Sequence, residues 1–462
     1  MIHNLTKSLL DEVIACALAT GADYAEVFVE HTRNNSVYMI GGKVESVADG
    51  IVSGASVRAF MGLRCVSSST TDVTRSGLLA CAAKVRDVIA EGKAALTVNL
   101  TPMAVNDIHK ITLVPADHTK AEKVELIRRG VNSAKEYSDK ITQVSGSILD
   151  VDHNILIASS DGFIKEDRQI RTRMAISAIA ANGTDMQSGF CGPGRKMGLE
   201  VFDLFPPEEI GKEAARSACV NLSADYCKAG KMTVAIDNGF GGVIFHEACG
   251  HSLEATCVAR GASQMCGKLG QQIANVKVTA VDDGTIPNAW GSINIDDEGT
   301  PSQRNVLIEN GILKSYMIDK FNARRMGMAP TGSSRRQSYA YDPTSRMTNT
   351  FIENGNDKNE DIIASIEYGL YCAKMGGGSV NPINGAFNFA VDEGYIVREG
   401  KICEPVRGAS LIGTGSDILM NIDMVGQNLS CGQGMCGSSS GSIPTDVGQP
   451  LIRVKEITVG GR

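Results

Sequence analysis

The start of the chain combines two spacings of apolar residues, one typical of a helix and one typical of a β-strand. Residues 5–20 place leucine, valine and isoleucine on one helical face, and Gly21 follows where a helix would end. Residues 24–31 and 35–50 alternate apolar and polar positions, and a Gly-Gly pair at 41–42 separates two extended runs. We therefore expect a helix followed by an antiparallel hairpin.

The same succession is then repeated along the first half of the chain. The further segments are the helical ranges 76–95 and 119–141, the strand-like ranges 143–162 and 170–183, and a helical range at 206–224 that opens with a proline pair and glutamates. Helices alternating with antiparallel hairpins are typical of the α+β class. We predict an N-terminal α+β domain, with antiparallel hairpins and flanking helices, over residues 1–225.

Beyond residue 225 the pattern changes to short β runs between glycine turns. Residues 231–239 form a strand-like run, and 292–301, 305–319 and 394–406 each have a strand–turn–strand pattern, the last two turning at Asn-Gly and Glu-Gly. A chain of 462 residues exceeds what one hydrophobic core usually holds. The expected fold is α+β, with a β-rich C-terminal domain over residues 226–462.

Composition and charge exclude several classes of protein. The net charge is -7 and only 5% of residues are aromatic, which disfavours a nucleic-acid surface. "RRQ" at 335–337 is the best local basic patch, and we interpret it as a solvated loop. No apolar run is long enough to span a bilayer, and Asp11 and Glu12 interrupt the N-terminal pattern, unlike a signal peptide. The thirteen cysteines are scattered and odd in number, which disfavours a disulfide framework. We therefore expect a cytoplasmic protein.

The segment "GGVIFHEACGHSLEA", residues 241–255, places His246 and His251 five positions apart, with Glu247 directly after the first. Each residue of an α-helix advances by about 100°, so side chains five apart diverge by about 140°. The two rings converge only if the helix widens into a π-bulge or breaks before the second histidine. Gly250 stands where it can give the backbone that freedom.

Residue chemistry makes this segment a candidate metal site. Imidazoles bind borderline metals, and Glu247, beside the first ligand, can accept a proton without binding the metal. The other five histidines lie in the N-terminal half, so a third ligand from the C-terminal domain must be a carboxylate or a thiolate. The candidates are Glu254, Cys431 and Cys436. A thiolate would favour zinc over magnesium or calcium and would leave a fourth position open.

The alternative is a helix whose histidines form only local hydrogen bonds. Cys249 and Cys257, close to the motif, are interpreted as small buried hydrophobes rather than ligands.

Five longer segments resemble one known family. They read "HEACGHSLEA", "SINIDDEGTPSQRNVLIENGILKSYMIDKFNARRMGM", "PTGSSRRQSY", "RMTNTF" and "GMCGSSSGSIPTDVGQPLIRVKEITVGG". In this order they resemble the TldD branch of the TldD/PmbA metalloproteases, a family long described as modulators of DNA gyrase. The resemblance is dense from about residue 235 to the C-terminus and looser before it.

This resemblance implies a set of site residues. It makes His246 and His251 two zinc ligands, Cys436 of "GMCG" the third ligand, and Glu247 the catalytic glutamate. Glu254 then becomes a candidate for a carboxylate that hydrogen-bonds to a ligating histidine without binding the metal itself. One departure is visible, because family members often carry a lysine after Cys-Gly and a glutamine soon afterwards, where this chain has the serines of "GSSSGS".

The resemblance also implies a partner and a substrate. Family members pair, with a second copy or with a metal-free sister subunit of the PmbA (TldE) type, and enclose a chamber where unfolded peptides bind as an added β-strand. The leading hypothesis is a zinc-dependent peptidase in which Tyr339, Arg335 and Arg336 are candidates for stabilising the oxyanion. The alternatives are a non-catalytic, metal-stabilised subunit that modulates gyrase or an antitoxin by binding, and, ranked last, a cysteine-based redox protein.

Overall fold

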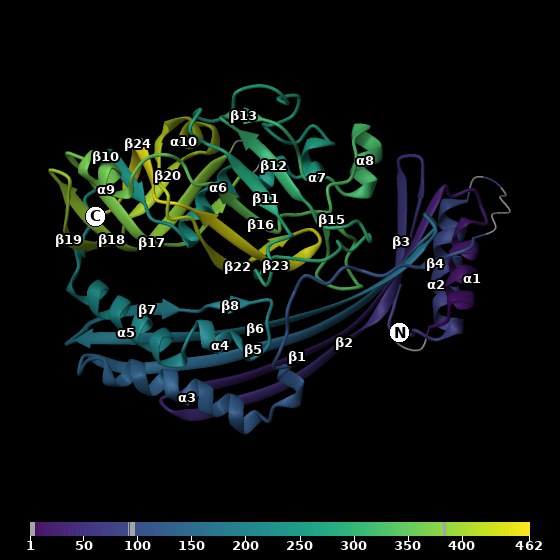
Figure 1. Ribbon diagram of the computed structural model, residues 1–462, viewed down its shortest axis with the longest axis horizontal. Helices are drawn as coiled ribbons and strands as arrows, with labels where there is room; N and C mark the ends of the chain where they lie inside the picture. The colour runs from purple at the N-terminus through teal and green to yellow at the C-terminus, as the bar shows by residue number, and fades with distance from the viewer. Residues whose placement is uncertain (1–4, 91, 93–97, 382–384) are drawn as a thin grey trace.

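The computed structural model describes residues 5–90, 92, 98–381 and 385–462, and Figure 1 shows a long, bowed sheet with the C-terminal half lying over it. Four long antiparallel strands dominate this first sheet, namely β1 (Tyr24–Ile40), β2 (Lys43–Met61), β5 (Ile141–Ser159) and β6 (Phe163–Asn182). The shorter strands are β3 (Arg64–Thr70), β4 (Thr101–Pro102), β7 (Asp185–Cys191) and β8 (Gly194–Arg195). Both predicted hairpins are present, the first turning at Gly41 and Gly42 with positive φ.

Two pairs of helices cover the sheet face to which odd-numbered residues of β1 point. Val27 and Val29 pack against α1 (Lys7–Leu18) and α2 (Arg75–Ile89), at the end of the sheet seen on the right in Figure 1. Val37 packs against α3 (Lys120–Glu136) and α5 (Pro207–Ser223) at the other end; the short α4 spans Val201–Leu204. These helices match the predicted ones, although residues 91 and 93–95 of the predicted second helix lie outside the described residues.

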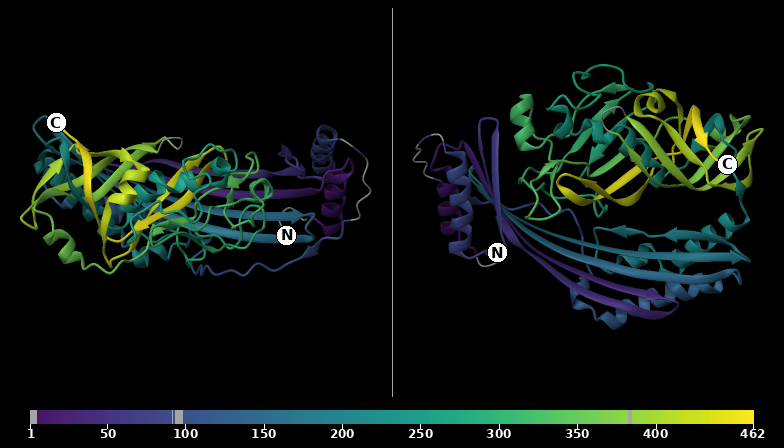
Figure 2. Two further views of the ribbon diagram at one scale, coloured as in Figure 1. Left: turned by 90° about the horizontal axis from the view of Figure 1, so that it is seen from above. Right: turned by 180° about the vertical axis from the view of Figure 1, so that it is seen from behind.

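Even-numbered residues of β1 face the C-terminal half, which lies inside the bow of the sheet in the right-hand view of Figure 2. Glu26 and Glu30 are 1% exposed although the strand pattern alone would place them in water. Arg336 donates to Glu26 at 3.0 Å, and Arg58 of β2 bridges Glu26 and Glu298. The interpretation of residues 335–337 as a solvated loop was therefore wrong, because both arginines are buried and Arg336 contacts this sheet.

The C-terminal half contains two further sheets. The second consists of β9 (Asp225–Tyr226), β10 (Gly230–Ile236), β17 (Tyr368–Val380), β18 (Ala386–Arg398), β19 (Lys401–Arg407), β20 (Ser410–Thr414), β21 (Ile422–Val425) and β24 (Ile452–Gly460). Pairing of β17 with both β10 and β18 closes it into a small barrel. The third consists of β11 (Ala280–Asp283), β12 (Arg304–Glu309), β13 (Ile312–Leu313), β16 (Asn349–Ile352), β22 (Ser430–Ser438) and β23 (Gly441–Gln449).

Short elements connect these sheets. They are α6 (Val243–Ala248), α7 (Ala255–Val258), α8 (Lys320–Met326), α9 (Asn359–Ala364), α10 (Gly415–Asn421) and the β14–β15 pair (Ser334–Arg335, Thr344–Ser345). The sequence pattern missed α8, α9 and α10, which are each no longer than two turns and therefore show little helical period. No helix in the described part of the chain is both long and apolar enough to cross a membrane.

The α+β class is confirmed, and the two predicted tight turns are present. Asn310–Gly311 and Glu399–Gly400 both have positive φ, as two-residue hairpins require. The strands predicted within 292–301 reduce to one bridge, between Ile295 and Pro301, because the Asp296 carboxylate accepts the N–H groups of Glu298 and Thr300. The division of the chain at residue 225 stays a prediction.

Replacing Arg58 by Met is expected to lower the free energy of unfolding by about 3–5 kcal/mol, because it leaves the buried Glu298 carboxylate without its arginine and Glu26 with Arg336 alone. Urea unfolding measures the change. Arg75→Met is the matched control, since Arg75 forms a solvent-exposed pair with Glu12 and its loss should leave stability nearly unchanged. Equal effects of the two variants would contradict the importance of the buried network.

Candidate metal centre

The histidine motif lies on a helix that breaks between its two histidines. The α6 helix ends at Ala248, Cys249 leaves helical geometry with φ −133° and ψ −44°, and a 3-10 turn follows over Gly250–Leu253. The break lets both rings turn to one side, so that the His246 and His251 ring centres lie 5.0 Å apart at an interplanar angle of 86°. Of the two predicted ways to converge the rings, the chain uses the break.

Gly250 contributes in a different way from the one predicted. Its φ is not positive, and the residue that departs from helical geometry is Cys249. A Cβ on Gly250 would instead overlap the sulfur of Met347, which is fully buried beneath the turn. Glycine is therefore needed at this position for close packing rather than for backbone freedom.

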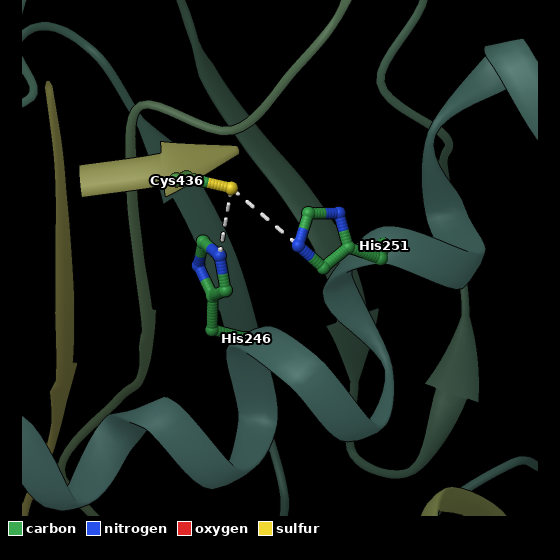
Figure 3. Close-up of side chains that lie close together, drawn as sticks. All are labelled: His246, His251 and Cys436. Atoms are coloured by element: carbon green, nitrogen blue, oxygen red, sulfur yellow. Dashed lines mark hydrogen bonds between the residues drawn. The ribbon is translucent and has the colours of Figure 1, made fainter. Parts of the chain in front are cut away.

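The third side chain comes from the other end of the chain. Cys436 lies on β22, the edge strand of the third sheet, and points toward the two histidines (Figure 3). Its Sγ lies 3.3 Å from Nε2 of His246 and 3.4 Å from Nε2 of His251. Among the described residues, these three form a group whose ligand atoms all lie within 4.8 Å of one another.

The donor set fits a tetrahedral zinc ion. With Zn–N and Zn–S bonds of about 2.0–2.1 Å and 2.3 Å, nitrogen and sulfur ligands of one zinc lie roughly 3.5 Å apart. Both measured separations are close to this value.

Burial alone would raise the pKa of the Cys436 thiol, but His246 and His251 lower that pKa to about 4, so the sulfur is a thiolate at neutral pH.

Two carboxylates stand beside the group, one on each side. Glu254 Oε1 lies 3.2 Å from Nδ1 of His251, the ring nitrogen that faces away from Cys436. Burial lowers and Glu254 raises the pKa of His251, and the net result is a pKa well above the ordinary value. Glu247 Oε2 lies 3.9 Å from Nε2 of His251, and its side chain is 23% exposed, more than any of the three grouped side chains.

The other cysteines considered from the sequence lie outside the group. Cys431 is on the same strand as Cys436, but an odd separation of five residues places the two side chains on opposite faces. Cys249 is fully buried in the hydrophobic core, where burial raises its pKa to about 12. Cys257 lies partly buried, also outside the group.

The three oxyanion candidates are held by contacts elsewhere. Arg336 donates to Glu26 and Ser56 of the first sheet, and Arg335 donates to the carbonyls of Met347 and Pro444. The Tyr339 backbone N–H donates to Glu30. These contacts show how the two arginines and the Tyr339 backbone are fixed, and a role for any of the three at an oxyanion stays a prediction.

Models of one protein family match most of the chain. The PmbA/TldA metallopeptidase domain 1 matches residues 25–89, the central domain matches 114–222, and the C-terminal domain matches 229–461. All three grouped side chains lie in the last of these ranges.

Individual relatives match over nearly the whole length. A metalloprotease TldD homolog of Haemophilus influenzae is 37% identical, covering 99% of this chain and 97% of its own. A zinc metalloprotease TldD homolog of Saccharolobus solfataricus is 25% identical, covering 96% and 97%. A Thermotoga maritima structure described as a modulator of a DNA gyrase shares the fold, with a TM-score of 0.80, 20% identity and coverage of 98% and 99%. TldE of Thermococcus kodakarensis has a TM-score of 0.76, 18% identity and coverage of 95% and 97%.

Gly250→Ala is expected to lower the free energy of unfolding by about 1–3 kcal/mol, because the added methyl group overpacks the site against Met347. The loss should be much smaller in a Met347→Ala background, where the space is vacated. Urea unfolding of the two single variants and the double variant measures this coupling. A loss that is the same in both backgrounds would place the strain in the backbone instead.

Proposed function

The chain belongs to the TldD/PmbA family of metalloproteases, and on this basis we propose that it is a zinc-dependent peptidase that hydrolyses unfolded peptides or small proteins. The observation that carries the proposal is the convergence of His246, His251 and Cys436, with the partly exposed Glu247 beside them. In this proposal the three converging side chains are the zinc ligands. The name of the Saccharolobus solfataricus relative, a zinc metalloprotease, agrees with this metal.

Each residue has a distinct task in the proposed reaction. A zinc ion held by the two imidazoles and the thiolate would polarise the scissile carbonyl and make the attacking water more acidic. The Glu247 carboxylate accepts a proton from that water and returns it to the leaving amine nitrogen. His246 and His251 must present Nε2 as a lone pair, so a proton on either ring has to reside at Nδ1.

The proposed substrate is an extended, unfolded chain. His246 is 3% and Cys436 7% exposed, so little of the proposed ligand set is open to a broad, folded surface. An extended peptide is narrow, and it can be held through its main chain with little dependence on side-chain sequence. This is the binding mode that the family resemblance implies.

The competing proposal is a non-catalytic subunit in which a metal only stabilises the fold and the protein acts by binding gyrase or an antitoxin. A purely structural zinc usually has four protein ligands and no use for a free carboxylate. The described residues bring three ligand atoms together and add Glu247, which favours catalysis.

We further propose a cytoplasmic protein that pairs with a second copy or with a PmbA/TldE-type sister subunit. All thirteen cysteines are free, which suits a reducing compartment. On β2, strand β3 pairs only with residues 55–61, so the outer edge of residues 43–54 has no strand partner in the described part of the chain. Exposed Val44, Val47 and Ile51 lie on this segment, which suits an interface.

Replacing Glu247 by Gln is expected to lower kcat by about 10²–10⁴-fold while the protein keeps its zinc, because the proton acceptor is lost and the ligands remain. The measurement is cleavage of a fluorescently labelled unfolded peptide, with zinc content per chain determined in parallel, with and without a sister subunit. Cys436→Ala is the companion variant and should lose both zinc and cleavage. If the wild type holds zinc yet cleaves nothing under either condition, the metal is structural and the peptidase proposal fails.

Removing the metal with a chelator is expected to abolish cleavage, and added Zn²⁺ should restore it. Mg²⁺ and Ca²⁺ should not, because these hard cations prefer oxygen ligands to imidazole and thiolate. Activity assays after dialysis against each ion provide the measurement. Restoration by Mg²⁺ would mean that the three converging side chains are not the catalytic ligands.

A further inference from the structure

Arg346 belongs to the segment "RMTNTF", for which neither the sequence nor the proposed reaction supplies a role. It lies between β15 and β16 and is completely buried. A buried guanidinium is costly unless its donors are used, so its partners indicate why it is there.

One side of the Arg346 guanidinium holds the strand that carries Cys436. Nη2 donates to the Cys436 carbonyl at 2.5 Å, and Nη1 donates to Ser440 Oγ at 2.8 Å and to the Gly441 carbonyl at 2.9 Å. These acceptors span the turn between β22 and β23. The arginine therefore fixes the backbone of the proposed sulfur ligand directly.

The Nε side of the Arg346 guanidinium lies near Glu254, whose carboxylate in turn lies beside the proposed ligand His251. Nε of Arg346 lies 3.8 Å from Glu254 Oε1, and this oxygen lies 3.2 Å from Nδ1 of His251. These are charge contacts rather than aligned hydrogen bonds, because neither Oε1 nor Nε has a hydrogen-bond partner in the described part of the chain. Carboxylates placed behind a metal-ligating histidine orient the ring and fix its tautomer.

We infer that Arg346 is a positioning residue which, with Glu254, sets the distance between His251 and Cys436 and so tightens zinc binding. The inference rests on the proposed metal site and adds to it a single side chain that reaches both ligand segments, one through a carboxylate and one through a carbonyl. A lysine at this position keeps the charge, but its one ammonium group cannot serve both directions.

The test compares zinc dissociation constants, measured by competition with a chelator, together with the absorption spectrum of the Co²⁺-substituted protein. Arg346→Lys and Glu254→Gln should each weaken zinc binding by about 10–100-fold and alter the Co²⁺ spectrum. The double variant should lose less than the product of the two effects, because part of the Arg346 effect passes through Glu254 to His251 and is already lost in Glu254→Gln.

One control variant separates positioning from general stability. Arg58→Lys disturbs a buried arginine of the first sheet that contacts neither Glu254 nor Cys436. It should lower the melting temperature and still bind zinc as the native chain does.

The inference is overturned if Arg346→Lys lowers the melting temperature but binds zinc as tightly as the native chain. It is also overturned if the effects of Arg346→Lys and Glu254→Gln simply add. Should Arg346→Lys fail to fold, Glu254→Gln decides alone, since unchanged zinc affinity in that variant contradicts the inference. Absence of zinc from the wild type would instead refute the proposed function itself.

Discussion

The candidate metal centre depends on the parallel pairing of β16 with β23. Asn349, Thr350 and Phe351 pair with Asp446, Val447 and Gly448, and β23 in turn holds the edge strand β22 without a register shift. Since side chains alternate along a strand, a slip of one residue would turn Cys436 away from both histidines. The pairing thus fixes the sulfur against a helix that begins almost two hundred residues earlier. Arg346, in the segment that leads into β16, adds a hydrogen bond to the Cys436 carbonyl of β22.

The strands and helices of the first half could be predicted because their apolar positions repeat locally. What the pattern could not reveal is the environment of the polar face of β1. Glu26 and Glu30 are typical of a solvent-facing strand side, yet both are buried against the C-terminal half. Glu26 pairs with Arg58 and Arg336, and Glu30 accepts the backbone N–H of Tyr339. These partners lie far from the two glutamates in sequence, and a local pattern carries no information about such pairings.

The candidate site divides in the same way. The need for either a π-bulge or a break between His246 and His251 follows from helix geometry alone, and the structure has the break. The reason for Gly250 did not follow, because it depends on Met347, which reaches the turn only through the fold. From residue chemistry, Cys431 and Cys436 were equally eligible, and only the strand face separates them. The resemblance to a family also selects Cys436 over Cys431.

Burial around the centre decreases toward Glu247, and this gradient links the fold to the proposed chemistry. His246 and Cys436 belong to or border the hydrophobic core, where water is scarce and electrostatic contacts are strong. Glu247 follows His246 on α6, and its side chain is 23% exposed to solvent. A reactant that needs both the ligands and the carboxylate must therefore approach from the Glu247 side.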